Sequence, residues 1–261
     1  MSDIAMVLAI TIPAALASPI GGLIALSRPL TSFLLSIAVG FAGGVLLATF
    51  AFEMLPKALE LSSLPLAVAG FSMGFALVYA LDLFIHRGRL AGKESDEREA
   101  VRRFHLRHPP RGSETTVLAG GTSAEELIEG ATIGIGVAID PSVGIIVAIA
   151  ICIDNISEAM SIGELVEDEQ RQGRGKPHRK VLGWTSLIGL SLLVSAVLGW
   201  WLLRDIPLAG LGTMFAIGAG GMFYLTVTDL LPEAEGHQYQ QSSAIAAGLG
   251  FLTIFVLSEL M

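Results

Sequence analysis

Apolar residues fill eight stretches of the chain, each about 20 residues long and separated by shorter polar segments. A helix needs about 20 apolar residues to cross the hydrocarbon core of a bilayer, because it rises about 1.5 Å per residue. The pattern therefore predicts an all-α polytopic membrane protein in which residues 1–261 form a single transmembrane domain. The eight helices are expected at about residues 4–26, 31–54, 64–85, 116–139, 143–162, 181–203, 208–231 and 243–260.

Composition favours the same class of protein. Apolar residues make up 52% of the chain and charged residues only 15%, whereas soluble domains usually carry about 25% charged residues. The net charge of −8 conceals an uneven distribution, because basic residues gather in two connections. The single cysteine, Cys152, excludes an internal disulfide.

The basic residues predict the orientation of the chain in the membrane. Two connections, residues 86–114 and 164–180, hold 13 of the 16 Lys and Arg residues. Positively charged loops stay on the cytoplasmic side of a membrane. With eight spans, both termini then lie outside the cytoplasm, in a multi-pass protein of the cell membrane. The 86–114 connection is also poor in apolar residues, so we expect a disordered cytoplasmic loop there.

Two of the apolar stretches contain a repeated pattern of polar and acidic residues. A charge at the centre of a bilayer costs roughly 2.5–3.5 kcal/mol on insertion scales, so a cluster of acids there indicates a function. Residues four apart lie on one face of a helix, and the short connection at Asp140 makes the two helices antiparallel neighbours. Facing each other, the two patterns would form a cage of carboxylate and amide oxygens for a divalent cation. The six candidate ligands are Glu125, Glu126, Glu129, Asp154, Asn155 and Glu158.

The first acidic pattern has an alternative interpretation. Ser123 followed by Glu126 matches a capping box, in which the glutamates would occupy the solvated first turn of a shorter helix. The second pattern has no such alternative, because an unbroken apolar run at 145–153 precedes it. The recurrence of the pattern therefore favours the metal site over the cap.

Further acids lie at the ends of two other spans. Glu53 and Asp229 each stand three residues before a proline, at the ends of the second and seventh spans. This repetition suggests related halves, spans 1–3 and 6–8, flanking spans 4 and 5, as transporters with internal repeats have. Glu233 and His237 follow the seventh span. They are candidates for receiving a metal ion at the cytoplasmic exit, with a plain solvated loop as the alternative.

At these positions the chain resembles the ZIP family of divalent metal transporters. That family carries His-Asn-x-Pro-Glu-Gly in its fourth span and a related copy in the fifth. The matching segments here are Glu125-Glu126-Leu127-Ile128-Glu129-Gly130 and Asp154-Asn155-Ile156-Ser157-Glu158-Ala159. The resemblance implies eight helices in a 3+2+3 arrangement, with spans 4 and 5 lining a two-metal site. Glu129 and Glu158 would bridge the ions, the other four residues would complete the shells, and Glu53 and Asp229 would lie along the pathway.

The departures from the family pattern bear on the choice of metal. Acids replace both histidines, Ile128 and Ser157 replace both prolines, and the sixth span lacks the acid that some members have. The transported ion is therefore expected to be a divalent cation of the zinc, iron, manganese or cadmium class, with its identity left open. The lost residues put the second metal position in question.

The predicted function is transport of divalent metal cations into the cytoplasm, with no covalent chemistry. One alternative is a degenerate ZIP-like protein that binds or senses metal without moving it, and another is a membrane carboxylate-metal enzyme. No Glu-x-x-His or His-Glu-x-x-His motif falls within the spans, which argues against the enzyme. The expected partners are metal ions and the lipid bilayer, without nucleic acid, and a homodimer is the assembly considered.

Overall fold

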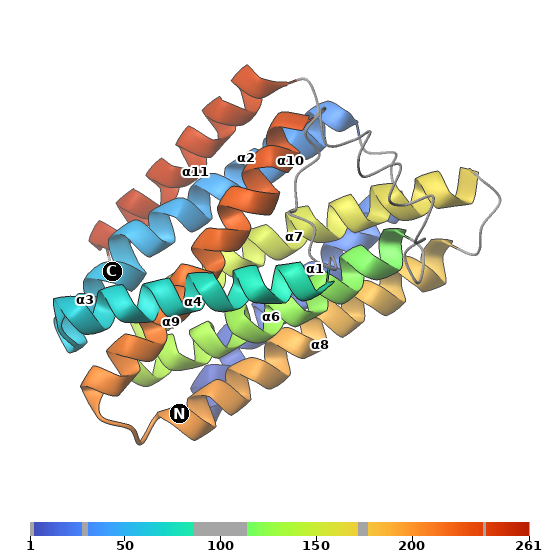
Figure 1. Ribbon diagram of the computed structural model, residues 1–261. Helices are drawn as coiled ribbons and strands as arrows, with labels where there is room; N and C mark the ends of the chain where they lie inside the picture. The colour runs from blue at the N-terminus through green and yellow to red at the C-terminus, as the bar shows by residue number, and fades with distance from the viewer. Residues whose placement is uncertain (1–2, 28–30, 86–113, 172–176, 237–238, 261) are drawn as a thin grey trace.

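The computed structural model describes residues 3–27, 31–85, 114–171, 177–236 and 239–260, and every regular element in these ranges is a helix (Figure 1). The predicted 86–114 loop and His237 lie outside the described residues, apart from Glu114. The helices are α1 (Asp3–Ser27), α2 (Ser32–Ala48), η1 (Thr49–Met54), α3 (Leu55–Leu61), α4 (Leu64–Ile85), α6 (Glu114–Ile139), α7 (Pro141–Arg171), α8 (Pro177–Leu203), α9 (Leu208–Leu225), η2 (Thr226–Leu230), α10 (Leu231–Gly236) and α11 (Gln240–Leu260).

Seven stretches of the described chain are long and apolar enough to cross a membrane. They belong to α1, α2 with η1 and α3, α4, α7, α8, α9 with η2 and α10, and α11. The remaining long helix, α6, has 26 residues but contains Glu125, Glu126 and Glu129. The architecture is therefore that of a polytopic helical membrane protein, and α6 is the long helix of the described ranges that hydropathy alone does not identify as a span.

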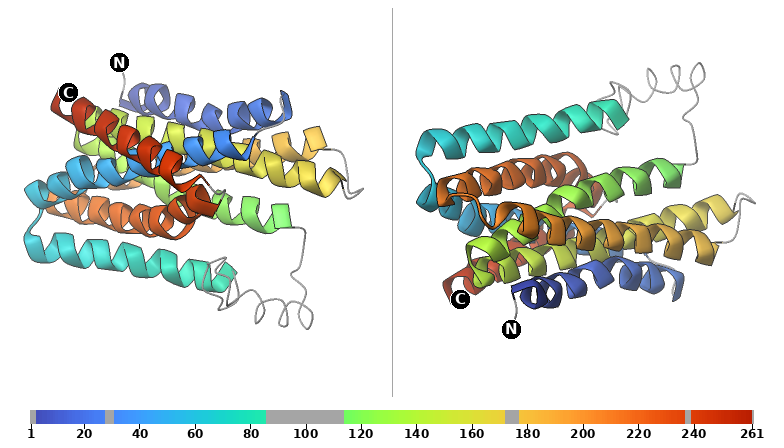
Figure 2. Two further views of the ribbon diagram at one scale, coloured as in Figure 1. Left: turned by 90° about the horizontal axis from the view of Figure 1, so that it is seen from above. Right: turned by 90° about the horizontal axis from the view of Figure 1, so that it is seen from below.

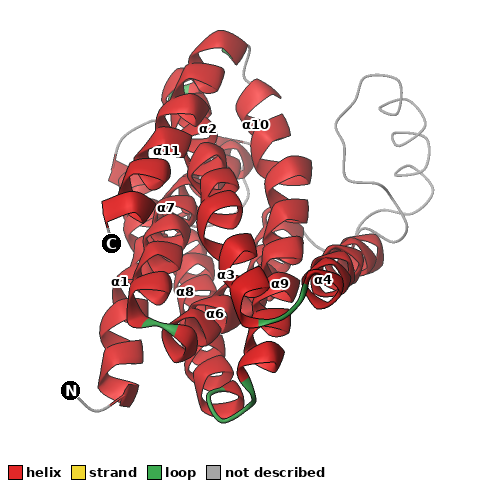
Figure 3. Ribbon diagram, turned by 90° about the vertical axis from the view of Figure 1, so that its left-hand side faces the viewer, coloured by secondary structure: helices red, strands yellow, loops and turns green. Residues whose placement is uncertain are grey.

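Four helices form a central bundle. In this bundle α6 packs against α8, α8 against α1, α1 against α7, and α7 against α6. The helices α1 and α6 are thus diagonal to each other across the bundle. Figure 3 shows these four helices grouped together, with α4 at the opposite edge of the molecule from α1.

Two further helix pairs flank the bundle. One pair is α2 with α11, and α2 also contacts α7; the other is α4 with α9, and α9 also contacts α6. Both views of Figure 2 place α4 and α1 at opposite edges. Each helix that carries an acidic motif is therefore covered by one flanking pair.

Glycines allow the flanking pairs to approach closely. A Cβ atom added at Gly44 of α2 would collide with the carbonyl oxygen of Ala247 in α11. One added at Gly74 of α4 would collide in the same way with the carbonyl oxygen of Ile217 in α9. Backbone-to-backbone packing of this kind is how membrane helices gain van der Waals contact without a hydrophobic driving force.

The second and seventh predicted spans are each interrupted by a π-helical turn. The amide of Leu55 donates to the carbonyl of Phe50, and that of Leu231 donates to Thr226, so both bonds run five residues back. Pro56 and Pro232 follow directly. A proline has no N–H, and its ring displaces the carbonyl four residues earlier, which explains the widened turn.

A capped turn joins α6 to α7. Asp140 precedes Pro141, the first residue of α7, and its Oδ1 atom accepts hydrogen bonds from the Ser142 amide (2.9 Å) and hydroxyl (2.7 Å). These bonds stabilise the ionised form and lower the pKa of the Asp140 carboxyl. The capped proline starts α7 at once, so α6 and α7 run antiparallel.

Helix α7 is longer than the apolar pattern indicates. Apolarity ends near residue 162, but the helix continues to Arg171, through part of the polar 164–180 connection. The added residues include Glu, Leu, Gln and Arg, which are good helix formers. A helix can continue into water after its apolar segment ends. Hydropathy therefore predicts the limits of the membrane span but not those of the helix.

Candidate metal centre

The first acidic motif lies inside α6. The side chains of Glu126 and Glu129 are 1% and 5% exposed, and Glu125 is partly buried. Since α6 begins at Glu114, Ser123 lies within the helix, and the capping-box alternative is wrong. Both carboxylate oxygens of Glu126 lack a hydrogen-bond partner.

The second motif lies in the middle of α7. Asp154 and Asn155 are buried and Glu158 is partly buried. The Oδ1 atoms of both Asp154 and Asn155 have no hydrogen-bond partner. The Asn155 amide nitrogen donates to the carbonyl of Ala14 in α1, at 3.4 Å. The same amide approaches the Glu126 carboxylate without reaching hydrogen-bonding geometry.

The antiparallel helices bring the two motifs together. The Glu129 carboxylate lies close enough to those of Glu126, Asp154 and Glu158 for electrostatic repulsion. Thr122, one turn before Glu126, donates from Oγ1 to Oε1 of Glu158 at 2.5 Å and so links α6 directly to α7. Like charges in an apolar interior require cations or protons to balance them.

Within the described ranges, no three His, Cys, Asp or Glu side chains converge closely enough to hold one metal ion together. The two residues that begin each motif are adjacent in sequence, so they point about 100° apart on their helix. Glu125 and Glu126 therefore face different neighbours, as do Asp154 and Asn155. The motifs form an extended acidic region with unpaired oxygens, which we call the acidic cluster, and not one closed cage.

A polar connection leads from the acidic cluster to α10. The Ser161 hydroxyl, one turn beyond Glu158, donates to Oε1 of Glu233 at 2.6 Å. Glu233 also lies near enough to Asp154 to repel it electrostatically. The structure thus joins one of the predicted exit residues to α7.

The two acids before prolines occupy the π-helical turns. Glu53 lies in η1 and is partly buried, while Asp229 lies in η2 and is exposed. Helices bearing these turns contact α7 and α6 respectively. Widened turns of this type are common at functional sites.

Sequence reasoning missed Thr122 and Ser161. Their spacing could in principle have identified both. Thr122 lies four residues before Glu126 and Ser161 lies three after Glu158, on the helix faces that carry the acids. Serine and threonine are frequent in membrane helices, where their hydroxyls usually bond to their own backbone. Spacing alone therefore does not separate these two from the rest.

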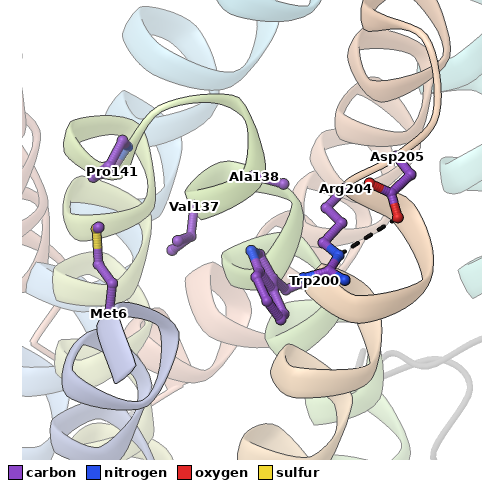
Figure 4. A pocket seen from close by; sticks show the side chains of 7 residues that line it. All are labelled: Met6, Val137, Ala138, Pro141, Trp200, Arg204 and Asp205. Carbon is purple, nitrogen blue, oxygen red and sulfur yellow. Dashed lines mark ion pairs between the residues drawn. The ribbon is translucent and has the colours of Figure 1, made fainter. Parts of the chain in front are cut away.

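A cavity of about 360 Å³ lies at the end of the bundle where α6 turns into α7, away from the acidic cluster (Figure 4). Arg204 lies over the Trp200 ring, 4.5 Å from its centroid, and its Nε atom is 3.5 Å from Asp205 Oδ2. The cavity is lined by Met6, Val137, Ala138, Pro141, Trp200, Arg204 and Asp205.

Comparison with known proteins places the chain in a family. A family model described as ZIP zinc transporter matches residues 89–258. The zinc transporter ZupT of Corynebacterium glutamicum is 33% identical, over 95% of this chain and 97% of the relative. The ZupT proteins of Corynebacterium efficiens and Stenotrophomonas maltophilia R551-3 are 30% and 29% identical, over 98% and 95% of this chain and 98% and 93% of theirs. The chain therefore belongs to the ZIP zinc transporter family.

Proposed function

We propose that this protein carries divalent metal ions, with zinc as the foremost candidate, across the membrane into the cytoplasm through the acidic cluster. Its relatives are named zinc transporters, and the similarity covers nearly the whole chain. The six residues of the two motifs would bind the ion in transit, which makes the metal the substrate and not a resident cofactor.

One observation carries the proposal. Four buried oxygen atoms of the two motifs, on Glu126, Asp154 and Asn155, have no hydrogen-bond partner. An unpaired polar group costs roughly 1–3 kcal/mol when buried, and an unpaired charge costs more. A divalent cation supplies charge balance and coordination at once, because carboxylate and amide oxygens are its usual ligands.

The ligand set bears on which metals are carried. All six candidates would bind a metal through oxygen atoms, five from carboxylates and one from the Asn155 amide, and no histidine lies within the motifs. Oxygen ligands suit harder ions such as Mn²⁺, while zinc more often binds nitrogen and sulfur. We therefore expect a broader range than zinc alone, with iron, manganese and cadmium as the other ions to test.

The helix contacts support two related halves around α6 and α7. Matching helices of the halves would be α1 with α8, α2 with α9, and α4 with α11. The contact of α2 with α11 then corresponds to that of α9 with α4, and the contact of α1 with α7 to that of α8 with α6. Each half also has one π-helical turn before a proline. Related halves around a central site are typical of transporters that work by alternating access, so we propose this 3+2+3 arrangement, with both termini outside.

We further propose an exit path along α7. Asp154, Glu158 and Ser161 recur every three to four residues and so share one face of the helix. The Ser161–Glu233 hydrogen bond extends that face to α10. An ion leaving the acidic cluster would meet oxygen ligands at each turn on its way to the cytoplasm.

Uptake into proteoliposomes tests the function. Purified protein would be offered Zn²⁺, Mn²⁺, Fe²⁺, Co²⁺ and Cd²⁺, and Glu129→Gln and Glu158→Gln would be compared with the native chain. We expect saturable uptake that both substitutions abolish, because each removes a charge from the acidic cluster. Glu259→Gln, an exposed acid near the end of α11, is the control and should transport normally.

Two results would contradict the proposal. Metal binding by the native protein without flux would indicate a sensor. Flux that neither substitution alters would show that ions pass elsewhere. Loss of folding in a variant is detected independently by its elution from a sizing column.

A further inference from the structure

Two hydroxyl groups of α1 are buried without partners. Thr11 and Ser18 are each 0% exposed, and neither side-chain oxygen has a hydrogen-bond partner. Every other buried Ser or Thr of the described chain donates a hydrogen bond, most often to its own helix backbone. We call these two residues the α1 hydroxyl pair, and the contrast requires an explanation, because an unpaired buried hydroxyl is unfavourable.

The packing of α1 shows where the pair points. This helix faces α7 at Ala14 and Gly21, and it faces α8 at Ala15 and Gly22. At about 100° per residue, the pair lies between these two directions, and its members are seven residues apart on almost the same line. The α1 hydroxyl pair therefore points between α7 and α8, into the interior of the four-helix bundle.

A carboxylate points into the same interior from the opposite side. Helix α6 is diagonal to α1 across the bundle, and it faces α8 at Gly130 and α7 at Thr122. Glu126 lies midway between these positions on the helical wheel, so it points toward α1. Its carboxylate lies beside the Asn155 amide, which in turn donates to the Ala14 carbonyl.

Register places these groups along one line. Ala14 marks the level of Asn155 and Glu126, and the α1 hydroxyl pair lies one helical turn to either side of it. The unpaired oxygens of Thr11, Ser18, Glu126 and Asn155 thus share the interior of one bundle. A cation bound there would give all four groups a partner.

We propose that α1 supplies two hydroxyl ligands for the divalent cation, Thr11 and Ser18, which bind it in turn as it passes Glu126 and Asn155. This inference rests on the proposed function and adds a third helix to the ion site. Hydroxyl and amide oxygens are neutral ligands that suit hard divalent cations. Neutral ligands on either side of the Glu126 carboxylate would bind the ion weakly enough for it to leave again, as conduction requires.

The test compares Thr11→Val, Ser18→Ala and the double variant with the native protein. Both the rise in melting temperature on adding Zn²⁺ or Mn²⁺ in detergent and the KM for uptake into proteoliposomes are measured. We expect the double variant to require about tenfold more metal in both measurements, the size of effect seen when a partner of a metal site is lost. Its melting temperature without metal should not fall, because the lost hydroxyls had no partners.

Two controls separate ligation from packing. Thr185→Val removes a buried α8 hydroxyl that bonds its own backbone, to Val181, at the same helix interface as Gly22. It should leave metal binding and KM unchanged. The double variant Thr11→Ser, Ser18→Thr keeps both hydroxyls. Its KM and its stabilisation by metal should equal those of the native protein.

The inference is overturned if the double variant matches the native protein in KM and metal-induced stabilisation, or if Thr185→Val shifts them equally. In either case the proposed function still stands, provided that the native protein takes up metal and Glu158→Gln does not. Absence of uptake by the native protein, or uptake that Glu158→Gln preserves, overturns the function together with the inference built on it.

Discussion

At the scale of single residues, the position of Glu158 depends on a hydroxyl of the neighbouring helix. Thr122 donates to its Oε1 at 2.5 Å across the contact between α6 and α7. A hydrogen bond to an ionised carboxylate is about twice as strong as one between neutral groups. Thr122 therefore holds one carboxylate of the acidic cluster without being an acid itself.

The substitution Thr122→Val tests this positioning role. It preserves shape and removes the donor, so Glu158 is free to turn away from the cluster. We expect KM for metal uptake to rise about tenfold with little change in expression. Thr132→Val, which removes a hydroxyl bonded to its own helix at Ile128, is the matched control. Equal KM values for the two variants would show that Thr122 does not position Glu158.

The acids and the hydroxyls differ in how visible they are from sequence. Glu126, Glu129 and Asp154 stand out because a charge in an apolar stretch is costly wherever its side chain points. A hydroxyl residue such as Thr122 or Ser18 can face lipid, pack in the core or line a binding site. Which of these environments it occupies depends on the neighbouring helices. The six-residue set remains a proposal that the substitution experiments must test.

At the scale of the helical element, the start of α7 depends on Asp140. Its carboxylate caps the helix through Ser142, and these bonds lower its pKa below the ordinary value of 3.8. A lowered folded-state pKa means that the ionised form stabilises the fold. This contribution is full above the unfolded pKa, and it is lost as pH falls through the folded pKa.

Replacing the cap should therefore have a pH-dependent effect. We expect Asp140→Ala to lower stability by about 1 kcal/mol at pH 7, the usual effect of losing a cap. The difference from the native protein should shrink as pH falls below 3.8. Denaturation followed by circular dichroism in detergent measures both. Asp140→Asn keeps a good cap without a charge, and a large loss of stability in that variant would contradict the capping explanation.

Helix positions follow from the sequence more readily than helix details. The described helix α4, Leu64–Ile85, covers the expected range 64–85, because an unbroken apolar run predicts a helix well. The π-helical turns were not predicted, although the recurring acid and proline marked their positions. Proline predicts a disturbed backbone, but whether that disturbance becomes a kink, a break or a widened turn depends on packing against adjacent helices.

At the scale of the whole molecule, close glycine contacts hold the helix pairs together. Gly74 brings α4 against the backbone of α9, and Gly44 does the same for α2 and α11. Such contacts are specified jointly by two distant segments. Sequence spacing of glycines suggests close packing, but it does not identify the partner helix.

Substitution of one contact glycine should separate a pair. Gly74→Ala forces a methyl group against the Ile217 carbonyl, and we expect a loss of about 1–3 kcal/mol, as overpacking usually causes. Gly248→Ala is the control, because no heavy atom lies within 4 Å of its added Cβ. Thermal unfolding of both variants in the same detergent gives the comparison. If Gly74→Ala were as stable as Gly248→Ala, the helices would be free to move apart.

The acidity of α6 has a consequence for how the protein enters the membrane during synthesis. Insertion machinery sorts each segment by its own hydropathy, and the glutamates at 125, 126 and 129 make the insertion of α6 on its own unfavourable. The neighbouring α7 is strongly apolar over Pro141–Gly163 and is joined to α6 by a single residue. We expect α6 to wait at the translocon until α7 emerges, and the two to enter the bilayer as a hairpin. The glutamates proposed to bind the metal thus make the membrane insertion of α6 dependent on α7.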